Sequence, residues 1–74
     1  MIASIMRRGI LVAMAKRDDI GIEEASFKAG IHPSTIYRFM SGEAEGPRIT
    51  TLETFCKDGL GYDFLTVARF GKQP

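Results

Sequence analysis

Several features that mark chemically specialised proteins are scarce in this sequence. It contains one cysteine, one histidine and no tryptophan. A single cysteine has no partner for a disulfide within the chain, and one cysteine with one histidine cannot supply the four ligands of a structural zinc site. No run of residues approaches the ~20 apolar positions that a membrane-spanning helix needs. The sequence therefore predicts a protein without a structural metal, an internal disulfide or a membrane span.

Signatures of catalysis are also missing. The sequence has no GxxxxGK loop that could hold phosphates, and a single histidine gives no support to a Ser-His-Asp or Cys-His arrangement. The acidic pairs Asp18-Asp19 and Glu23-Glu24 are adjacent in sequence, so their side chains diverge on a helix instead of converging on a substrate. We expect a protein that is not an enzyme, has no cofactor and binds no small-molecule substrate.

Positive charge exceeds negative charge only slightly. The 74 residues include ten Lys and Arg and nine Asp and Glu, for a net charge of +1. A nucleic-acid-binding chain is more often basic overall, so such a function here depends on the local distribution of charge. Apolar residues make up 45% of the chain and there are only three prolines. This composition is typical of a small folded domain, and residues 1–74 are predicted to form one.

The N-terminal segment predicts a helix that ends near Arg17. Arg7-Arg8 and the apolar run that follows, residues 9–15, resemble a short secretory signal. However, the apolar spacing of threes and fours continues on both sides of the arginines, as it does in a core helix. Arg7 and Arg8 are therefore expected to face solvent, and the protein is expected to stay in the cytoplasm. The apolar positions of this helix are Ile2, Ile5, Met6, Ile10, Ala13 and Met14.

The stretch from Ile22 to Ser41 organises the rest of the chain. Residues 22–29 predict a short helix that ends at Gly30, because a residue without a Cβ enters the left-handed region freely. Pro33 begins a second helix, where its missing N–H would be unpaired in any case. The apolar stripe of this second helix consists of Ile36, Phe39 and Met40. Two short helices that meet across a glycine turn form a helix-turn-helix.

The C-terminal half predicts two more short helices. Residues 43–48 form a loop by their glycine and proline content. Thr50 and Glu53 have the spacing of a capping box for a helix that ends at Gly59 or Gly61. A last helix covers residues 63–68, and residues 70–74 are a tail. With five helices and no alternating strand pattern, the fold class is all-α.

The residues of the central motif carry a resemblance to a known family. Ala29-Gly30-Ile31, the run from Ser34 to Phe39, and Ser41-Gly42 resemble the lambda-repressor-like (Cro-type) helix-turn-helix family. The run TIYRFMSG is also similar to the recognition helix of LacI-type repressors. The family resemblance implies a compact five-helix domain that binds double-stranded DNA.

Three positions depart from the family pattern. Ile22 stands where the family often has a glutamine that reaches a DNA phosphate, and Ala25 stands where a larger aliphatic residue is common. One extra residue is present around Gly59, before Leu60.

The resemblance also implies roles for individual residues. The helix that starts at Pro33 would lie in the major groove. The residues expected to contact bases are Ser34, Thr35, Tyr37 and Arg38. Those expected to contact the DNA backbone are Lys28, His32, Ser41 and Arg48. Arg38 could donate two hydrogen bonds to guanine or one to a phosphate.

Two functions follow from these expectations. The first is a sequence-specific transcriptional regulator, a phage or prokaryotic repressor that binds an operator as a homodimer. The second is a protein-interaction module, such as an antitoxin or a transcription-factor adaptor, because the acidic loop Glu43–Glu45 would repel phosphates. The apolar residues near the C-terminus either form a dimer surface or close the core; they are Tyr62, Phe64, Val67 and Phe70.

Overall fold

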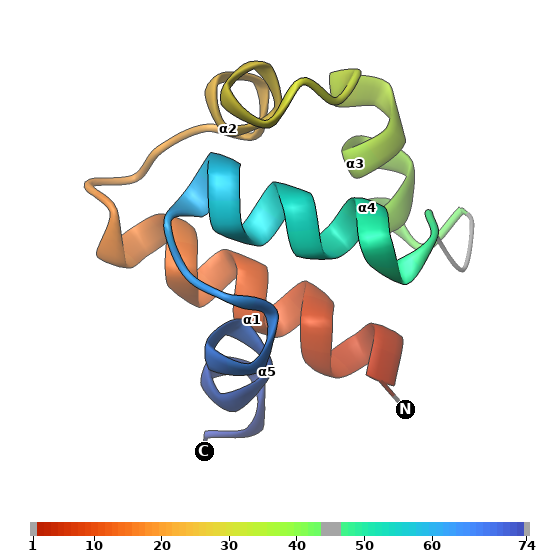
Figure 1. The fold of residues 1–74 in the computed structure, drawn as a ribbon. Coiled ribbons are helices and arrows are strands. Elements are labelled where there is room, and N and C mark those ends of the chain that lie inside the picture. Colours follow the sequence, from red (N-terminus) through yellow and green to blue (C-terminus); the bar gives the residue numbers. More distant parts are fainter. Residues whose placement is uncertain (1, 44–46, 74) are drawn as a thin grey trace.

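A computed structural model describes residues 2–43 and 47–73 of the chain. Within these ranges it contains helices and no strand, so the all-α prediction is confirmed (Figure 1). The helices are α1 (Ile2–Lys16), α2 (Ile22–Ala29), α3 (Pro33–Ser41), α4 (Ile49–Thr54) and α5 (Phe64–Lys72), and α4 continues directly into the π-helical segment η1 (Phe55–Leu60). No helix in these two ranges has the length and apolar character needed to cross a bilayer.

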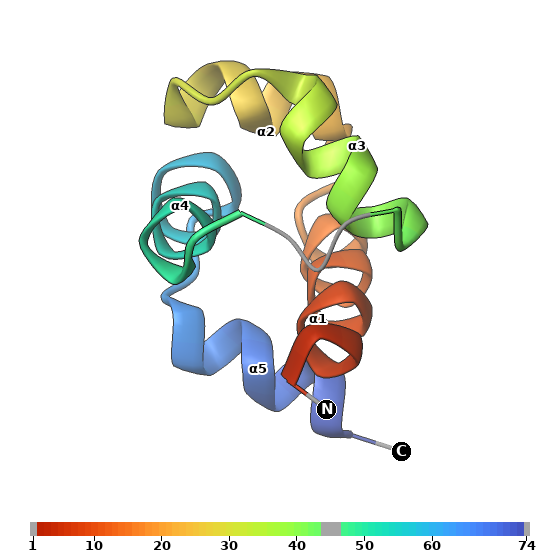
Figure 2. The ribbon, with the colours of Figure 1, turned by 90° about the vertical axis from the view of Figure 1, so that its right-hand side faces the viewer.

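The helices surround one core. Figures 1 and 2 show α2 and α5 at opposite ends of the molecule, with α1 and α4 between them and α3 along one side. The largest fully buried side chains come from α1, α3, η1 and α5, and they include Met6, Ile10, Ile36, Phe39, Phe55, Leu60 and Val67. The apolar stripes predicted for residues 2–17 and 33–41 therefore face each other across this core.

The link between α1 and α2 is a tight turn at Asp18 and Asp19. Both residues have a φ of 58°, in the left-handed region that aspartate tolerates better than most side chains. The Ile20 N–H donates to the Arg17 carbonyl across them at 3.2 Å. Ile20 is consequently turned back into the core, where it is buried.

The extra residue expected near Gly59 falls within the π-helical segment. In η1 the backbone is wider than in an α-helix, which is how a helix absorbs one inserted residue without shifting its neighbours out of register. The segment ends at Gly61, whose φ is 83°, and the Tyr62 N–H donates to the Cys56 carbonyl at 3.0 Å. Leu60 therefore stays fully buried.

Two departures from the family pattern meet at one contact between α2 and η1. A Cβ added to Gly59 would lie 2.5 Å from the carbonyl oxygen of Ala25. Such close approach of two backbones requires a residue without a side chain on one element and a small one on the other. The alanine at position 25 and the glycine at position 59 together allow η1 to lie against α2.

Helices α1 and α5 also meet through glycines. A Cβ on Gly9 would overlap the carbonyl group of Val67, and one on Gly71 would overlap that of Ile5. A glycine within a helix costs about 1 kcal/mol relative to alanine. Here the glycines allow the backbones of α1 and α5 to touch, and the outer surfaces of the two helices therefore lie side by side.

Two predictions about helix boundaries were wrong. Helix α4 begins at Ile49, with Arg48 as its N-cap and no side-chain cap hydrogen bond. Thr50 therefore lies inside the helix, and its carbonyl accepts a hydrogen bond from the Thr54 hydroxyl at 3.0 Å. Helix α5 continues to Lys72, so residues 70–72 do not belong to a tail; Pro74 lies outside the described ranges.

The C-terminal apolar residues close the core. Val67 is fully buried, and Tyr62, Phe64 and Phe70 pack against the buried cluster. The rings of Tyr62 and Phe70 meet edge to face, with their centroids 5.1 Å apart. These side chains therefore take part in closing the core, which was one of the two expectations for them.

Candidate nucleic-acid interface

The start of α3 is fixed by His32. This residue is the N-cap, with an extended backbone, and its Nδ1 accepts a hydrogen bond from the Ser34 N–H at 3.1 Å. Pro33 occupies the first helical turn, where it needs no hydrogen-bond acceptor. His32 was expected to contact the DNA backbone; its ring is exposed, but Nδ1 is occupied by the cap.

The turn before α3 is fixed by Gly30. Its φ is 71°, and the Ile31 N–H donates back to the Ser26 carbonyl at 2.9 Å. This pattern of hydrogen bonds satisfies carbonyls at the end of α2 and requires a left-handed residue at the turn. Gly42 ends α3 in the same way, with a φ of 82°. The boundaries predicted for these two helices from glycine and proline are therefore the observed ones.

Most of the residues predicted to contact bases lie on one exposed edge of α3. Ile36 and Phe39 are buried beneath the helix, whereas Ser34, Tyr37 and Arg38 are exposed, Tyr37 to 47%. Positions three and four apart share a helix face, so these three exposed side chains form a continuous edge of α3. Helix α3 itself lies at one side of the molecule in Figure 1. Thr35 is half-buried at the flank of this edge.

Two hydroxyls on this edge already have partners within the protein. The Ser34 hydroxyl lies 2.8 Å from Nδ1 of His32. The Ser41 hydroxyl donates to the Arg38 carbonyl at 3.1 Å and lies 3.5 Å from a carboxylate oxygen of Glu43. Ser41 was expected to contact the DNA backbone. Its hydroxyl could donate to a phosphate only after giving up its hydrogen bond to the Arg38 carbonyl.

Arg7 anchors α3 from behind, a role that the sequence reading missed. Its Nε donates to the Phe39 carbonyl at 2.6 Å, and its guanidinium lies 4.9 Å from the centre of the Phe39 ring. A cation near the carbonyls at the end of a helix also interacts favourably with the helix dipole. The expectation that Arg7 faces solvent was therefore wrong.

A signal for this role was present in the sequence. Arg7 falls four residues after Ala3 and three before Ile10, on the apolar stripe of α1 and not opposite it. Arg8 is exposed, as expected.

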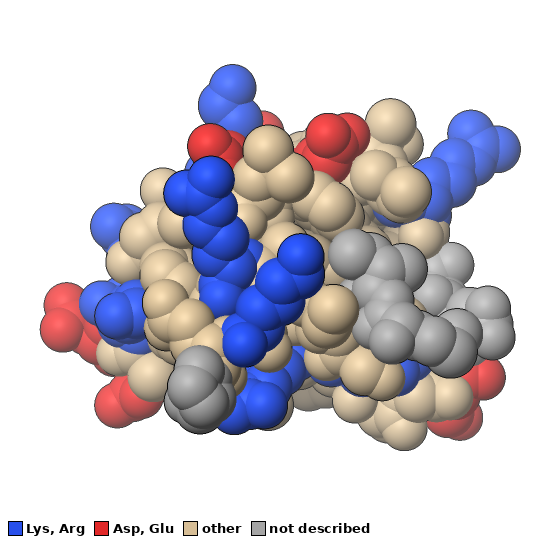
Figure 3. Space-filling model, turned by 90° about the horizontal axis from the view of Figure 1, so that it is seen from below, with Lys and Arg blue, Asp and Glu red and all other residues tan. Residues whose placement is uncertain are grey.

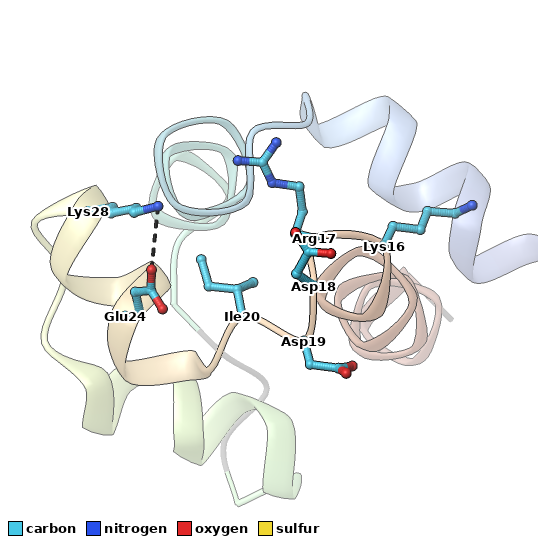
Figure 4. Close-up of a pocket in the computed structure, with 7 residues that line it drawn as sticks. All are labelled: Lys16, Arg17, Asp18, Asp19, Ile20, Glu24 and Lys28. Atoms are coloured by element: carbon cyan, nitrogen blue, oxygen red, sulfur yellow. Dashed lines mark ion pairs between the residues drawn. The ribbon is translucent and has the colours of Figure 1, made fainter.

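Lys28 and Arg48 are exposed but lie on other elements. The Lys28 ammonium is 3.6 Å from a carboxylate oxygen of Glu24. Lys28 and Glu24 line a hollow between α2 and the end of α1, and no α3 residue lines that hollow (Figure 4). The structure therefore does not bring Lys28 together with the exposed edge of α3. Arg48 is the N-cap of α4.

Charge around the motif is not that of a strongly basic surface. Between Ile22 and Gly61 the sequence has four basic and six acidic residues. Glu23 and Glu24 occupy the first turn of α2, where a phosphate would otherwise interact with the free N–H groups. Of the acidic loop, Glu43 is exposed and Glu45 lies outside the described ranges. Phosphate attraction at this face therefore depends on a few cations, chiefly Arg38.

A comparison with protein families covers both helices of the helix-turn-helix. Residues 10–57 match the model of the Cro/C1-type HTH DNA-binding domain. The chain belongs to this family. No curated protein and no solved structure matches the chain. The family match confirms the predicted helix-turn-helix and a DNA-binding domain, and it covers α2, α3 and α4. The first part of α1 and all of α5 lie outside it.

Proposed function

We propose that this protein is a sequence-specific transcriptional regulator, a repressor of prokaryotic or phage type that occupies an operator. One observation carries the proposal: the edge formed by Ser34, Tyr37 and Arg38 is exposed on a helix whose opposite side is locked into the core. A side chain can discriminate bases only if its helix is held rigidly against the duplex. The anchoring of α3 by Arg7 supports this rigidity.

In this proposal α3 enters the major groove with its N-terminal half toward the base edges. Arg38 reaches guanine with two donors or a phosphate with one. Thr35 offers a methyl group to thymine, and Tyr37 packs on a sugar or a thymine methyl. Ser34 contacts bases with the hydroxyl oxygen that faces solvent. The proposed backbone contacts remain Lys28, His32, Ser41 and Arg48.

A homodimer forms part of the same proposal. One module of this size buries little surface on DNA, so high affinity comes from two half-sites separated by one helical turn. The operator is then expected to be a near-palindrome. A regulator of this kind works where the DNA is, so we place it in the cytoplasm.

A second candidate function is favoured by the charge between Ile22 and Gly61. With two more acidic than basic residues there, the helix-turn-helix could serve as a protein-interaction module, such as an antitoxin or a transcription-factor adaptor. Its partner would be basic, since like charges at this face reduce affinity for phosphates.

Selection from random duplexes distinguishes the two functions. A repressor should enrich one motif, and Arg38→Ala should weaken binding to that motif by about 1–3 kcal/mol. Lys57→Ala is the matched control, because Lys57 is an exposed cation on η1. If no duplex is enriched at low salt and a basic protein binds the α3 face instead, the protein-interaction function holds.

A further inference from the structure

Helices α1 and α5 hold an excess of positive charge, of which the DNA-binding proposal uses only Arg7. Within their boundaries there are five basic residues and no acidic one. This contrasts with the acidic excess between Ile22 and Gly61. The basic residues are Arg7, Arg8, Lys16, Arg69 and Lys72.

Four of these cations lie on the outer sides of two helices that touch each other through Gly9 and Gly71. Arg8, Lys16, Arg69 and Lys72 are exposed, and together they are called the basic face below. Figure 3 views the molecule from the end where α5 lies, and Lys and Arg side chains gather at its centre while Asp and Glu lie toward the rim. The Lys16 ammonium lies 5.2 Å from the centre of the Phe70 ring, which brings a cation of α1 onto the surface of α5.

The basic face also contains an exposed leucine at helical spacing from two of its cations. Leu65 precedes Arg69 and Lys72 by four and seven residues, so the three share the outer side of α5. Leu65 is 69% exposed. Helix α5 therefore offers a large apolar side chain beside two cations.

We propose that the basic face binds an acidic, amphipathic segment of a partner protein, in which carboxylates meet the cations and apolar side chains cover Leu65. Charge complementarity supplies attraction and orientation, and burial of Leu65 supplies affinity. The exposed leucine favours a protein over a duplex, because the charged phosphates that line a DNA backbone leave little apolar surface to cover it.

A second copy of the chain does not fit this face in a symmetric dimer. In such a dimer the same surface patch lies on both subunits, so the cations of one copy would be placed near those of the other. The homodimer proposed above must therefore use another surface. The present inference does not depend on DNA binding.

The test uses a labelled helical peptide of ~18 residues, which is about 27 Å long. This length is close to the longest extent of the protein, which is 30 Å. Its Glu and Leu residues are spaced so that the leucines form one stripe. A scrambled peptide of the same composition and a poly-glutamate peptide are the ligand controls. Binding is followed by fluorescence anisotropy, and the surface is located by NMR chemical-shift changes in the full chain.

The striped peptide should bind more tightly than both controls and shift resonances of Leu65, Arg69 and Lys72 while those of α3 stay in place. Arg69→Glu together with Lys72→Glu should weaken binding about tenfold or more, as expected for like charges at an interface. Lys57→Glu, an exposed cation on η1, should leave it unchanged.

Three results would overturn the proposal. The first is equal binding of the scrambled peptide, which would make the leucine pattern irrelevant. The second is peptide binding at α3. The third is a non-specific duplex or an anionic vesicle that shifts the same resonances at lower concentration than the striped peptide.

Discussion

Replacing Arg7 should loosen the helix that carries the proposed DNA contacts. The informative change is Arg7→Met, because methionine keeps the aliphatic stem in its half-buried position and removes only the guanidinium. Two interactions with Phe39 are lost, the hydrogen bond of 2.6 Å to its carbonyl and the contact of 4.9 Å with its ring. The matched control is Arg8→Met, at the neighbouring exposed position.

The magnitude follows from these contacts. A hydrogen bond from a charged donor contributes about 1.5–3 kcal/mol. The lower end applies here, because the Phe39 carbonyl also accepts from the Gly42 N–H at 3.2 Å. The cation–π contact adds about 0.5–1 kcal/mol. The free energy of unfolding should therefore fall by about 2 kcal/mol, which corresponds to a loss of about 8–16 °C in Tm for a domain of this size. Arg8→Met should stay within about 0.5 kcal/mol of the parent.

Thermal unfolding followed by circular dichroism measures the stability, and hydrogen exchange measures the local effect. In Arg7→Met, amides of the last turn of α3, near Gly42, should exchange faster than in the Arg8→Met control. Equal melting temperatures for the two variants would show that Arg7 does not anchor α3. A loss of stability with unchanged exchange in α3 would assign the role of Arg7 to another part of the core.

Three further predictions concern packing, reactivity and pH. Gly59→Ala should lower the free energy of unfolding by about 1–3 kcal/mol, because the new Cβ overlaps the backbone of Ala25. Gly21→Ala is the control, because a Cβ there meets nothing within 4 Å. Equal urea midpoints for the two variants would contradict the contact between Gly59 and Ala25. Burial, aided by the negative charge of Asp63, raises the pKa of the Cys56 thiol to about 12. Iodoacetamide at pH 8 should therefore alkylate Cys56 only as fast as the protein opens. A labelling rate that does not depend on the urea concentration would disprove this. Hydrogen bonds from Thr66, with a smaller effect of the Arg69 charge, lower the pKa of Asp63 below its ordinary 3.8. The carboxylate therefore stabilises the fold above pH 3.8, and this contribution is lost as the pH falls through the lowered pKa. The difference in unfolding free energy between the parent and Asp63→Asn should shrink in that range, and a constant difference would contradict the prediction.

The sequence by itself determined the local structure of the motif. The end of α2 and both ends of α3 follow from Gly30, Pro33 and Gly42, because each of these residues restricts or frees its own backbone independently of the rest of the chain. The inward position of Ile36 and Phe39 follows from helical periodicity. The edge of α3 with Ser34, Tyr37 and Arg38 is the complement of that stripe and was predictable for the same reason.

The extra residue before Leu60 was visible in the sequence, but its effect was not. A helix can absorb an insertion as a π turn, as a bulge or by moving its end, and local propensity does not distinguish these outcomes. In the structure the residue lies in a π-helical segment, where Gly59 contacts the backbone of Ala25, a residue far away in sequence.

Only the tertiary structure decided which charges serve the fold and which reach solvent. Arg7 and Arg8 are neighbours with the same charge, yet one anchors a carbonyl that is 32 positions away along the chain and the other lies on the basic face. Likewise, the four cations of the basic face come together only because Gly9 and Gly71 let α1 and α5 touch. Local preferences act over one or two helical turns, whereas these contacts depend on how the helices pack against each other.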